Sequence, residues 1–151
     1  MNAAPAYTIL PLRLRDFKKL DAKKKQIRNW KRQARQGNRQ VFVCVENESG
    51  AFVARGDLVY DARDPDYTIP GQRVYISRVR VQPERRGQGI GTAMTQFLCN
   101  EARRQGFSEI SLGVNKDNAV ALHVYEKLGF DTLLFDGEDQ WGAYVKLLKR
   151  L

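Results

Sequence analysis

The sequence predicts an α/β fold, with a mixed central sheet flanked by helices, formed as a single domain over residues 1–151. The chain has 151 residues, a length typical of one domain. Segments with alternating apolar residues, typical of strands, are interspersed with segments whose apolar residues recur at helical spacing. The predicted order is β-α-β-β-β-α-β-α-β-β, which indicates a mixed α/β architecture.

The N-terminal half is predicted to begin with a strand over 7–14, which Pro11 places at a sheet edge or a bulge. Residues 16–36 carry apolar side chains at helical spacing. Three consecutive lysines at 23–25 interrupt this pattern, so one long helix and two shorter helices fit equally well. Further strands are expected over 40–47, 51–60 and 73–81, with a polar loop over 61–71.

The C-terminal half is predicted to alternate helices and strands. A helix over 92–106 follows a glycine-rich segment, and Gly106 is its expected C-terminal cap. Asp117 or Asn118 is the expected N-cap of a second helix. The remaining elements are a strand over 108–114, that helix over 117–130, a strand over 131–135, an acidic turn over 136–139 and a last strand over 141–148.

Composition argues against several classes of protein. Hydrophobic residues make up 42% of the chain, enough for a core, yet no apolar run reaches the ~18 residues of a membrane span. The start lacks the pattern of a secretory signal. Cys44 and Cys99 lie in apolar runs and are expected to be reduced thiols of a cytoplasmic protein. His123 is the only histidine, so no metal site is expected.

The net charge of +9 is concentrated in one segment. Residues 13–39 carry twelve basic and two acidic side chains. Such a segment is either a solvated helix face or a surface that attracts nucleic acid, an acidic partner or a polyanionic cofactor. A nucleic-acid partner is disfavoured because no recognised motif and few aromatic residues accompany the charge.

The stretch "PERRGQGIGTAM" (83–94) places Gly87, Gly89 and Gly91 between a predicted strand and a predicted helix. The first N–H groups of a helix have no partner within it, and glycine lets an anion approach them closely. The stretch is therefore predicted to bind phosphate. It lacks the Lys-Ser/Thr pair of a P-loop, and Thr92 replaces the third glycine of a dinucleotide-binding fingerprint.

The pattern Arg86-x-x-Gly89-x-Gly91 resembles the signature of the GNAT acetyltransferase superfamily, whose loop holds the pyrophosphate of coenzyme A. The stretch "NAVALHVYEKLGF" (118–130) resembles the family's next motif, Asn-x-x-Ala-x-x-x-Tyr-x-x-x-Gly-Phe. The order of the predicted elements is similar over nearly the whole chain. The resemblance implies the GNAT acyl-CoA N-acyltransferase fold and acetyl-CoA as cosubstrate.

By the same resemblance, the chain is expected to move an acetyl group to a primary amine by direct attack. The backbone N–H of Val79 is the implied oxyanion donor, and Tyr125 is the implied general acid for the departing thiolate. The residues implied in acetyl-CoA binding are Val79, Val81, Arg85, Arg86, Gly87, Gln88, Gly89, Ile90, Gly91, Thr92, Asn118 and Tyr125.

The general base is where the sequence departs from part of the family. Some members carry a glutamate on the strand before the loop, whereas residues 73–82 contain no acidic side chain. Tyr75 and Ser77 are the uncharged polar residues there, and Asp57 on a neighbouring strand is the closest carboxylate by topology. Asp57 and Tyr75 (as base or acceptor contact) are candidates, and a water relay fits equally well.

The acceptor is left open between a small-molecule amine and a peptide amine. Acidic residues near the expected cleft favour a cationic amine, whereas the basic segment favours an anionic acceptor. A homodimer is a further expectation. The alternative function is a non-catalytic regulator that uses the same fold to bind coenzyme A or nucleic acid. The acidic residues in question are Asp57, Asp61, Asp64, Asp66, Glu138 and Asp139.

Overall fold

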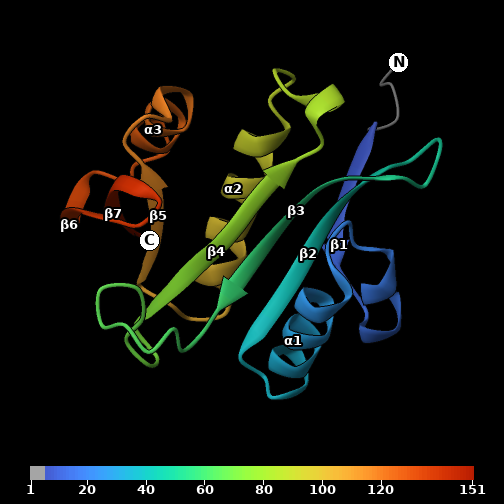
Figure 1. Ribbon diagram of the computed structural model, residues 1–151, viewed down its shortest axis with the longest axis horizontal. Coiled ribbons are helices and arrows are strands. Elements are labelled where there is room, and N and C mark those ends of the chain that lie inside the picture. The colour runs from blue at the N-terminus through green and yellow to red at the C-terminus, as the bar shows by residue number, and fades with distance from the viewer. Residues whose placement is uncertain (1–5) are drawn as a thin grey trace. The chain divides into compact units, whose positions relative to one another are not determined.

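The computed structural model describes residues 6–151 of the chain (Figure 1). Strands and helices alternate as the apolar periodicity predicts. The elements are β1 (Tyr7–Pro11), a 3₁₀ helix η1 (Leu14–Lys19), α1 (Lys24–Arg35), β2 (Arg39–Glu46), β3 (Phe52–Val59), β4 (Arg73–Val81), a 3₁₀ turn η2 (Pro83–Arg85), α2 (Ile90–Arg104), β5 (Glu109–Asn115), α3 (Ala119–Lys127), β6 (Thr132–Asp139) and β7 (Gly142–Arg150).

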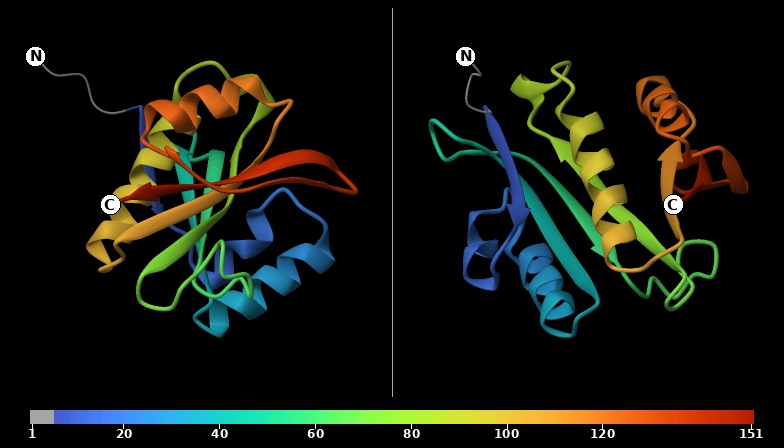
Figure 2. Two further views of the ribbon diagram at one scale, coloured as in Figure 1. Left: turned by 90° about the vertical axis from the view of Figure 1, so that its left-hand side faces the viewer. Right: turned by 180° about the vertical axis from the view of Figure 1, so that it is seen from behind.

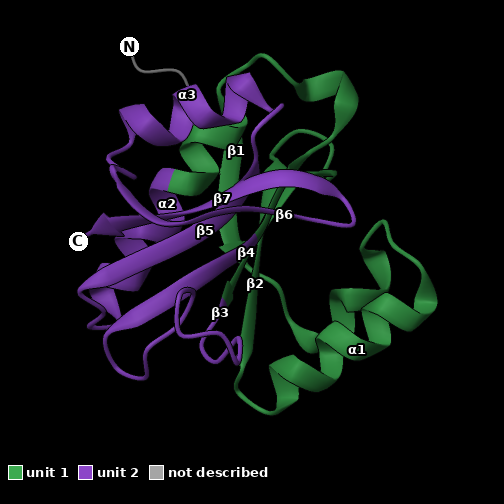
Figure 3. Ribbon diagram, turned by 60° about the vertical axis from the view of Figure 1, so that its left-hand side comes forward, with its two compact units in different colours: residues 1–58, 78–95 green, residues 59–77, 96–151 purple. Residues whose placement is uncertain are grey.

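The strands form a mixed sheet with the order β1-β2-β3-β4-β5-β7-β6, which confirms the predicted fold class. The chain divides into two compact units (Figure 3). Unit 1 comprises residues 1–58 and 78–95, and unit 2 comprises residues 59–77 and 96–151. Strand β4 therefore begins in unit 2 and ends in unit 1, and helix α2 begins in unit 1 and ends in unit 2.

In unit 1, β1 and β2 pair in antiparallel fashion, with Tyr7 opposite Glu46 and Pro11 opposite Phe42. Helix α1 lies along β2 (Figure 1). One face of β2 and the helical region share a buried apolar cluster, because alternate residues of a strand point to the same face. The cluster consists of Phe17, Leu20, Trp30, Val41 and Val43.

Two short helices, not one long helix, occupy the segment interrupted by lysines. The 3₁₀ helix Leu14–Lys19 ends before Leu20, and α1 begins at Lys24. Phe17 and Leu20 are buried beside Trp30 of α1, whereas Lys23, Lys24 and Lys25 are exposed. The break lets both apolar faces reach β2 while the lysines stay in solvent.

A buried ion-pair group lies on β3. Asp57 is fully buried, and its Oδ2 accepts hydrogen bonds from Arg39 Nη1 and Arg55 Nη2, both at 2.5 Å. Arg55 also donates from Nε to Asp57 Oδ1 at 3.2 Å, and its guanidinium lies 4.1 Å from the centre of the Trp30 ring. The one carboxylate thus joins β2 and β3, and Arg55 links them to α1.

In unit 2, β4 and β5 form a parallel ladder with Arg73 opposite Glu109 and Ile76 opposite Leu112. Strand β5 pairs with β7 in antiparallel fashion, and β7 pairs with β6 (Figure 2). The predicted acidic turn over 136–139 is wrong, because these residues belong to β6. The hairpin instead turns between Asp139 and Gly142, and the positive φ of Gly142 (115°) is a conformation that glycine tolerates.

We predict that Asp57→Ala lowers the free energy of unfolding by about 3–5 kcal/mol, because it leaves two buried guanidinium groups without their counter-ion. Urea denaturation followed by circular dichroism measures this loss. Glu48→Ala, at an exposed turn residue, is the control and is expected to change stability by less than ~0.5 kcal/mol. A loss below ~1 kcal/mol for Asp57→Ala would contradict the structural role of this carboxylate.

Candidate functional site

The glycine-rich loop of unit 1 takes a backbone path that requires glycine. Gly87 and Gly89 both have φ of +80°, a left-handed conformation that side chains disfavour. No atom lies within 4 Å of a Cβ built at either position, so the space above the loop is open. Gly91 lies against the preceding strand instead, where a Cβ would meet Val81 Cγ2 at 3.5 Å.

The backbone N–H groups from Gly87 to Thr92 have no acceptor among residues 6–151. Helix α2 begins at Ile90, and its first hydrogen bond runs from the Ala93 N–H to the Gly89 carbonyl at 3.0 Å. Six consecutive donors at the positive end of a helix are an arrangement that can bind an anion with several oxygen atoms. A pyrophosphate group fits this description.

Side chains of unit 1 brace the loop from one side. Arg85 pairs with Glu46 at 2.5 Å and donates to the Tyr7 hydroxyl at 3.4 Å. The Tyr7 hydroxyl in turn donates to Gln88 Oε1 at 3.2 Å. Arg85 therefore acts on the loop mainly by holding it to β1 and β2. The exposed Arg86 side chain makes no hydrogen bond or ion pair within residues 6–151, so it is the cation available to a bound phosphate.

Strand β4 changes the direction of its backbone groups along its length. At its start, the Gln72 carbonyl accepts from the Glu109 N–H at 3.1 Å, toward β5. Just past its end, the Gln82 N–H donates to the Val53 carbonyl at 2.9 Å, toward β3. In a regular strand, the backbone groups of all even-numbered residues point to the same edge. Those of Gln72 and Gln82 point to opposite edges, which indicates an extra residue between them.

This change of direction determines which edge of the sheet the backbone groups at the end of β4 point to. Because Gln82 faces β3, the adjacent Val81 presents its N–H and C=O to the other edge of β4. The β4–β5 ladder stops at Ile76, so Val79 and Val81 lie beyond it. Both belong to unit 1, together with the glycine-rich loop.

Tyr125 lies on α3 in unit 2, and Asn118 directly precedes this helix. The Tyr125 ring packs edge-on against Phe130, with the ring centres 5.8 Å apart. Burial raises the pKa of its phenol, and within residues 6–151 the hydroxyl has no hydrogen-bond partner. Asn118 caps the helix, because its side-chain oxygen accepts from the Ala121 N–H at 3.2 Å.

The contacts of Asp57 argue against the role of general base that the sequence suggested. Its side chain is fully buried, and both carboxylate oxygens accept from Arg55. The carboxylate is therefore occupied by its two arginines and shielded from solvent, so an amine has no access to it. Tyr75, in unit 2, stacks on Tyr67 with ring centres 4.1 Å apart. Strand β4 itself contains no acidic residue.

The acidic loop of unit 2 is also committed to structural contacts. Lys146 on β7 donates to Asp64 at 2.8 Å and to Asp66 at 3.1 Å, and burial leaves its own side chain 9% exposed. The charge of Lys146 offsets the charges of Asp64 and Asp66, which argues against these two acids as the binding site of a cationic amine. Asp61 accepts from the Arg63 N–H, and Asp139 accepts from the Trp141 N–H at the hairpin turn.

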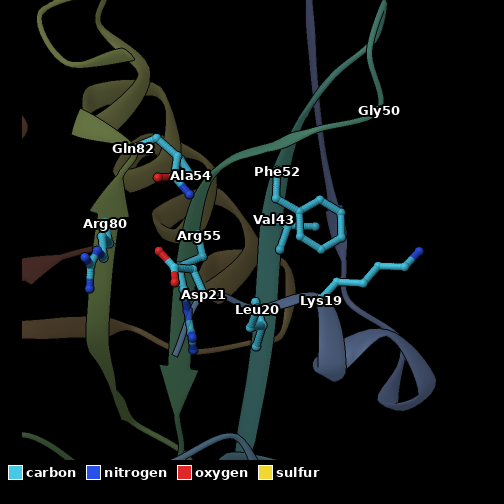
Figure 4. A pocket seen from close by; sticks show the side chains of 10 residues that line it. All are labelled: Lys19, Leu20, Asp21, Val43, Gly50, Phe52, Ala54, Arg55, Arg80 and Gln82. Carbon is cyan, nitrogen blue, oxygen red and sulfur yellow. The ribbon is translucent and has the colours of Figure 1, made fainter. Parts of the chain in front are cut away.

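Sequence reasoning missed a cavity in unit 1. It has a volume of about 260 Å³, and charged side chains from β3 and β4 line it (Figure 4). Arg55 and Arg80 are the cations that the strands supply. A signal was present in the sequence: two arginines, at 78 and 80, lie close together on a predicted strand immediately before the glycine-rich loop.

The donor set fits coenzyme A. Six N–H groups and Arg86 suit its pyrophosphate, and the free edge of β4 at Val81 suits an extended amide-containing arm. Among residues 6–151, no group of three or more His, Cys, Asp or Glu side chains has an arrangement that holds a metal ion. No helix in that range is both long and apolar enough to cross a membrane.

A model of the acetyltransferase (GNAT) family matches residues 6–130 of the chain. The streptothricin acetyltransferase of Streptomyces lavendulae is 33% identical over 106 residues, which cover 65% of this chain and 56% of that protein. The N-alpha-acetyltransferase 30 of Schizosaccharomyces pombe is 41% identical over 91 residues, which cover 59% of this chain and 55% of that protein. The chain thus spans just over half the length of these two relatives.

Solved structures match almost the whole chain, across both units. A GNAT family acetyltransferase from Elizabethkingia anophelis, solved with acetyl-CoA bound, gives a TM-score of 0.73 over 98% of this chain and 100% of that chain, at 15% identity. The ribosomal-protein-S5-alanine acetyltransferase of Vibrio fischeri gives 0.76 over 99% of this chain and 95% of that chain, at 12% identity. At these identities the matches establish the fold.

We predict that Gly89→Glu abolishes binding of inorganic pyrophosphate, because it places a carboxylate and a strained backbone among the free N–H groups. Isothermal titration calorimetry measures this loss. Gly37→Glu is the matched control, because Gly37 has a similar φ (75°) and equally open surroundings at the end of α1. Equal pyrophosphate affinity in both variants would refute the assignment of the loop.

Proposed function

Since the chain belongs to the acetyltransferase (GNAT) family, we propose that it transfers the acetyl group of acetyl-CoA to a primary amine. The observation that carries this proposal is the row of six unpartnered N–H groups from Gly87 to Thr92. Relatives named streptothricin acetyltransferase and N-alpha-acetyltransferase 30 support a small-molecule or peptide amine as acceptor.

In this proposal, the loop holds the pyrophosphate and β4 holds the rest of the cosubstrate. The N–H groups from Gly87 to Thr92, with Arg86 at their rim, bind the phosphate oxygens. The backbones of Val79 and Val81 bind the pantetheine arm as an added strand. The thioester supplies an acetyl group attached to a sulfur leaving group. The Val79 N–H polarises the acetyl carbonyl and stabilises the negative oxygen that forms during attack.

Tyr125 is the proposed general acid. A neutral amine attacks the carbonyl carbon, the C–S bond breaks, and the Tyr125 hydroxyl gives its proton to the departing sulfur. The free hydroxyl and the raised pKa of Tyr125 support this role, because the phenol keeps its proton throughout the neutral range. The attacking nitrogen becomes positively charged and loses a proton to water, since Asp57 is committed to its two arginines, and solvent returns a proton to Tyr125.

The rival function is a regulator that binds coenzyme A or nucleic acid without catalysis. Helix α1 carries the exposed basic residues, but its single aromatic residue, Trp30, is 7% exposed and covered by Arg55. No ring on this helix is therefore available to stack on bases. The free hydroxyl of Tyr125 likewise favours an enzyme.

We predict that Tyr125→Phe lowers kcat about 10²–10⁴-fold, the usual contribution of a general acid, and leaves acetyl-CoA affinity within about twofold. Thiol release measures turnover, and calorimetry measures binding. Tyr60→Phe is the matched control, because it removes one hydroxyl from the same unit, where that hydroxyl donates to Gln105. Full turnover in Tyr125→Phe would refute its role, and an absence of acetyl-CoA binding by the unmodified protein would refute the function.

The raised pKa of Tyr125 also sets the expected pH dependence. The acid form persists to higher pH than that of a free phenol, whose pKa is about 10. The ratio of unmodified to Tyr125→Phe turnover is therefore expected to stay constant from about pH 6 to 9 and to fall only above about pH 10. A ratio that declines near pH 7 would contradict this assignment.

A further inference from the structure

The cavity of unit 1 has two chemically different sides (Figure 4). Phe52 and Val43, from β3 and β2, form an apolar side, and Arg55, Arg80 and Gln82 form a polar side. The 3₁₀ helix and the residues after it complete the lining with Lys19, Leu20 and Asp21. A volume of about 260 Å³ is small for a ligand pocket and suits a group the size of an amino acid.

Positive charge predominates in this lining. Lys19, Arg55 and Arg80 line the cavity together with one carboxylate, that of Asp21. Lys19 pairs with Asp16 at 3.3 Å, and Arg55 pairs with Asp57 at 2.5 Å. Asp21 forms no ion pair with any of them, and Arg80 makes no hydrogen bond or ion pair within residues 6–151. Arg80 is exposed on β4, so its guanidinium is free to bind a ligand in the cavity.

The residues behind the polar side add positive charge. Arg78, on the same strand, lies 5.2 Å from the centre of the Trp30 ring and has no hydrogen-bond partner within the described part of the chain. Burial, followed by the nearby charge of Arg55, lowers the pKa of the Arg78 guanidinium. Asp57 is shared between Arg39 and Arg55 and so leaves the charge of Arg78 and Arg80 uncompensated.

The cavity lies close in sequence to the reacting atoms of the proposed function. Arg80 stands between Val79 and Val81, the residues whose backbones are proposed to hold the thioester end of acetyl-CoA. A group bound by the Arg80 side chain would therefore lie near the thioester, in the part of the site that the amine acceptor must enter in the proposed function.

We propose that this cavity binds a carboxylate of the amine acceptor, with Arg80 as the main contact and Arg55 in support. The acceptor is accordingly a primary amine that also carries a carboxylate, either a free amino acid or a peptide with an acidic side chain near its N-terminus. This inference rests on the proposed acetyl transfer.

The test compares matched acids and amides as acceptors. One arm uses the standard amino acids other than proline, a secondary amine, and cysteine, whose own thiol would be detected, together with their primary amides. The other uses tetrapeptides that differ only by Asp or Asn at the second residue. Thiol release from acetyl-CoA gives kcat/KM for each pair. For at least one pair we expect the acid to exceed the amide by about tenfold or more, and the arm in which this occurs identifies the source of the carboxylate.

Variants assign the preference to the cavity. Arg80→Gln is expected to reduce the acid-to-amide ratio about tenfold, which corresponds to about 1.4 kcal/mol. Arg35→Gln removes the same charge from an exposed position on α1 and is expected to leave the ratio unchanged. Both variants use the same acceptor pairs, so differences in amine basicity cancel from the comparison.

The outcomes separate this inference from the proposed function. Acetyl-CoA binding with turnover on amides that equals turnover on acids overturns the carboxylate subsite and leaves acetyl transfer standing. The subsite is likewise overturned if Arg80→Gln and Arg35→Gln lower the acid-to-amide ratio equally, because the preference then reflects overall charge. Acetyl-CoA binding with no turnover in either arm also overturns the subsite, whereas failure to bind acetyl-CoA overturns the function itself.

Discussion

The start of helix α2 is the constraint around which the rest of the site is arranged. A helix leaves its first N–H groups without partners, and in this chain the residues that lead into it continue the row. The row forms because Gly87 and Gly89 take a left-handed backbone, which turns successive N–H groups outward. The bracing of Arg85 by Glu46 and Tyr7 holds the loop to the sheet, so the donors are already in place before an anion arrives.

The second organising feature is that unit 1 has more arginines on β2, β3 and β4 than carboxylates that pair with them. Asp57 neutralises Arg39 and Arg55 in the interior, where a lone guanidinium would be costly. Arg78 and Arg80 of β4 have no such partner among residues 6–151, and Arg80 lines the cavity. Asp57, which the sequence suggested as a catalytic base, therefore has a structural role: it neutralises the buried arginines beside the cavity.

Periodicity predicted the fold well where side chains alternate cleanly. Strand β4 begins and ends at the expected residues 73 and 81, and Asn118 caps its helix as expected. The acidic run at 136–139 was misread as a turn because its exposed residues lie on an edge strand, where polar side chains are tolerated. The pairings of Asp57 and Asp64 were not predictable, since their partners Arg39 and Lys146 are 18 and 82 residues away.

The most direct test of pyrophosphate binding by the glycine-rich loop follows the backbone amides themselves. Heteronuclear NMR of the uniformly ¹⁵N-labelled protein during a titration with coenzyme A reports on each N–H group separately. If the N–H groups of the loop bind the pyrophosphate, the amide resonances of residues 87–92 shift together with one saturation curve, while that of Gly37 stays in place. Saturable binding of coenzyme A that leaves the amides of residues 87–92 unshifted would contradict the proposal that these N–H groups bind its pyrophosphate.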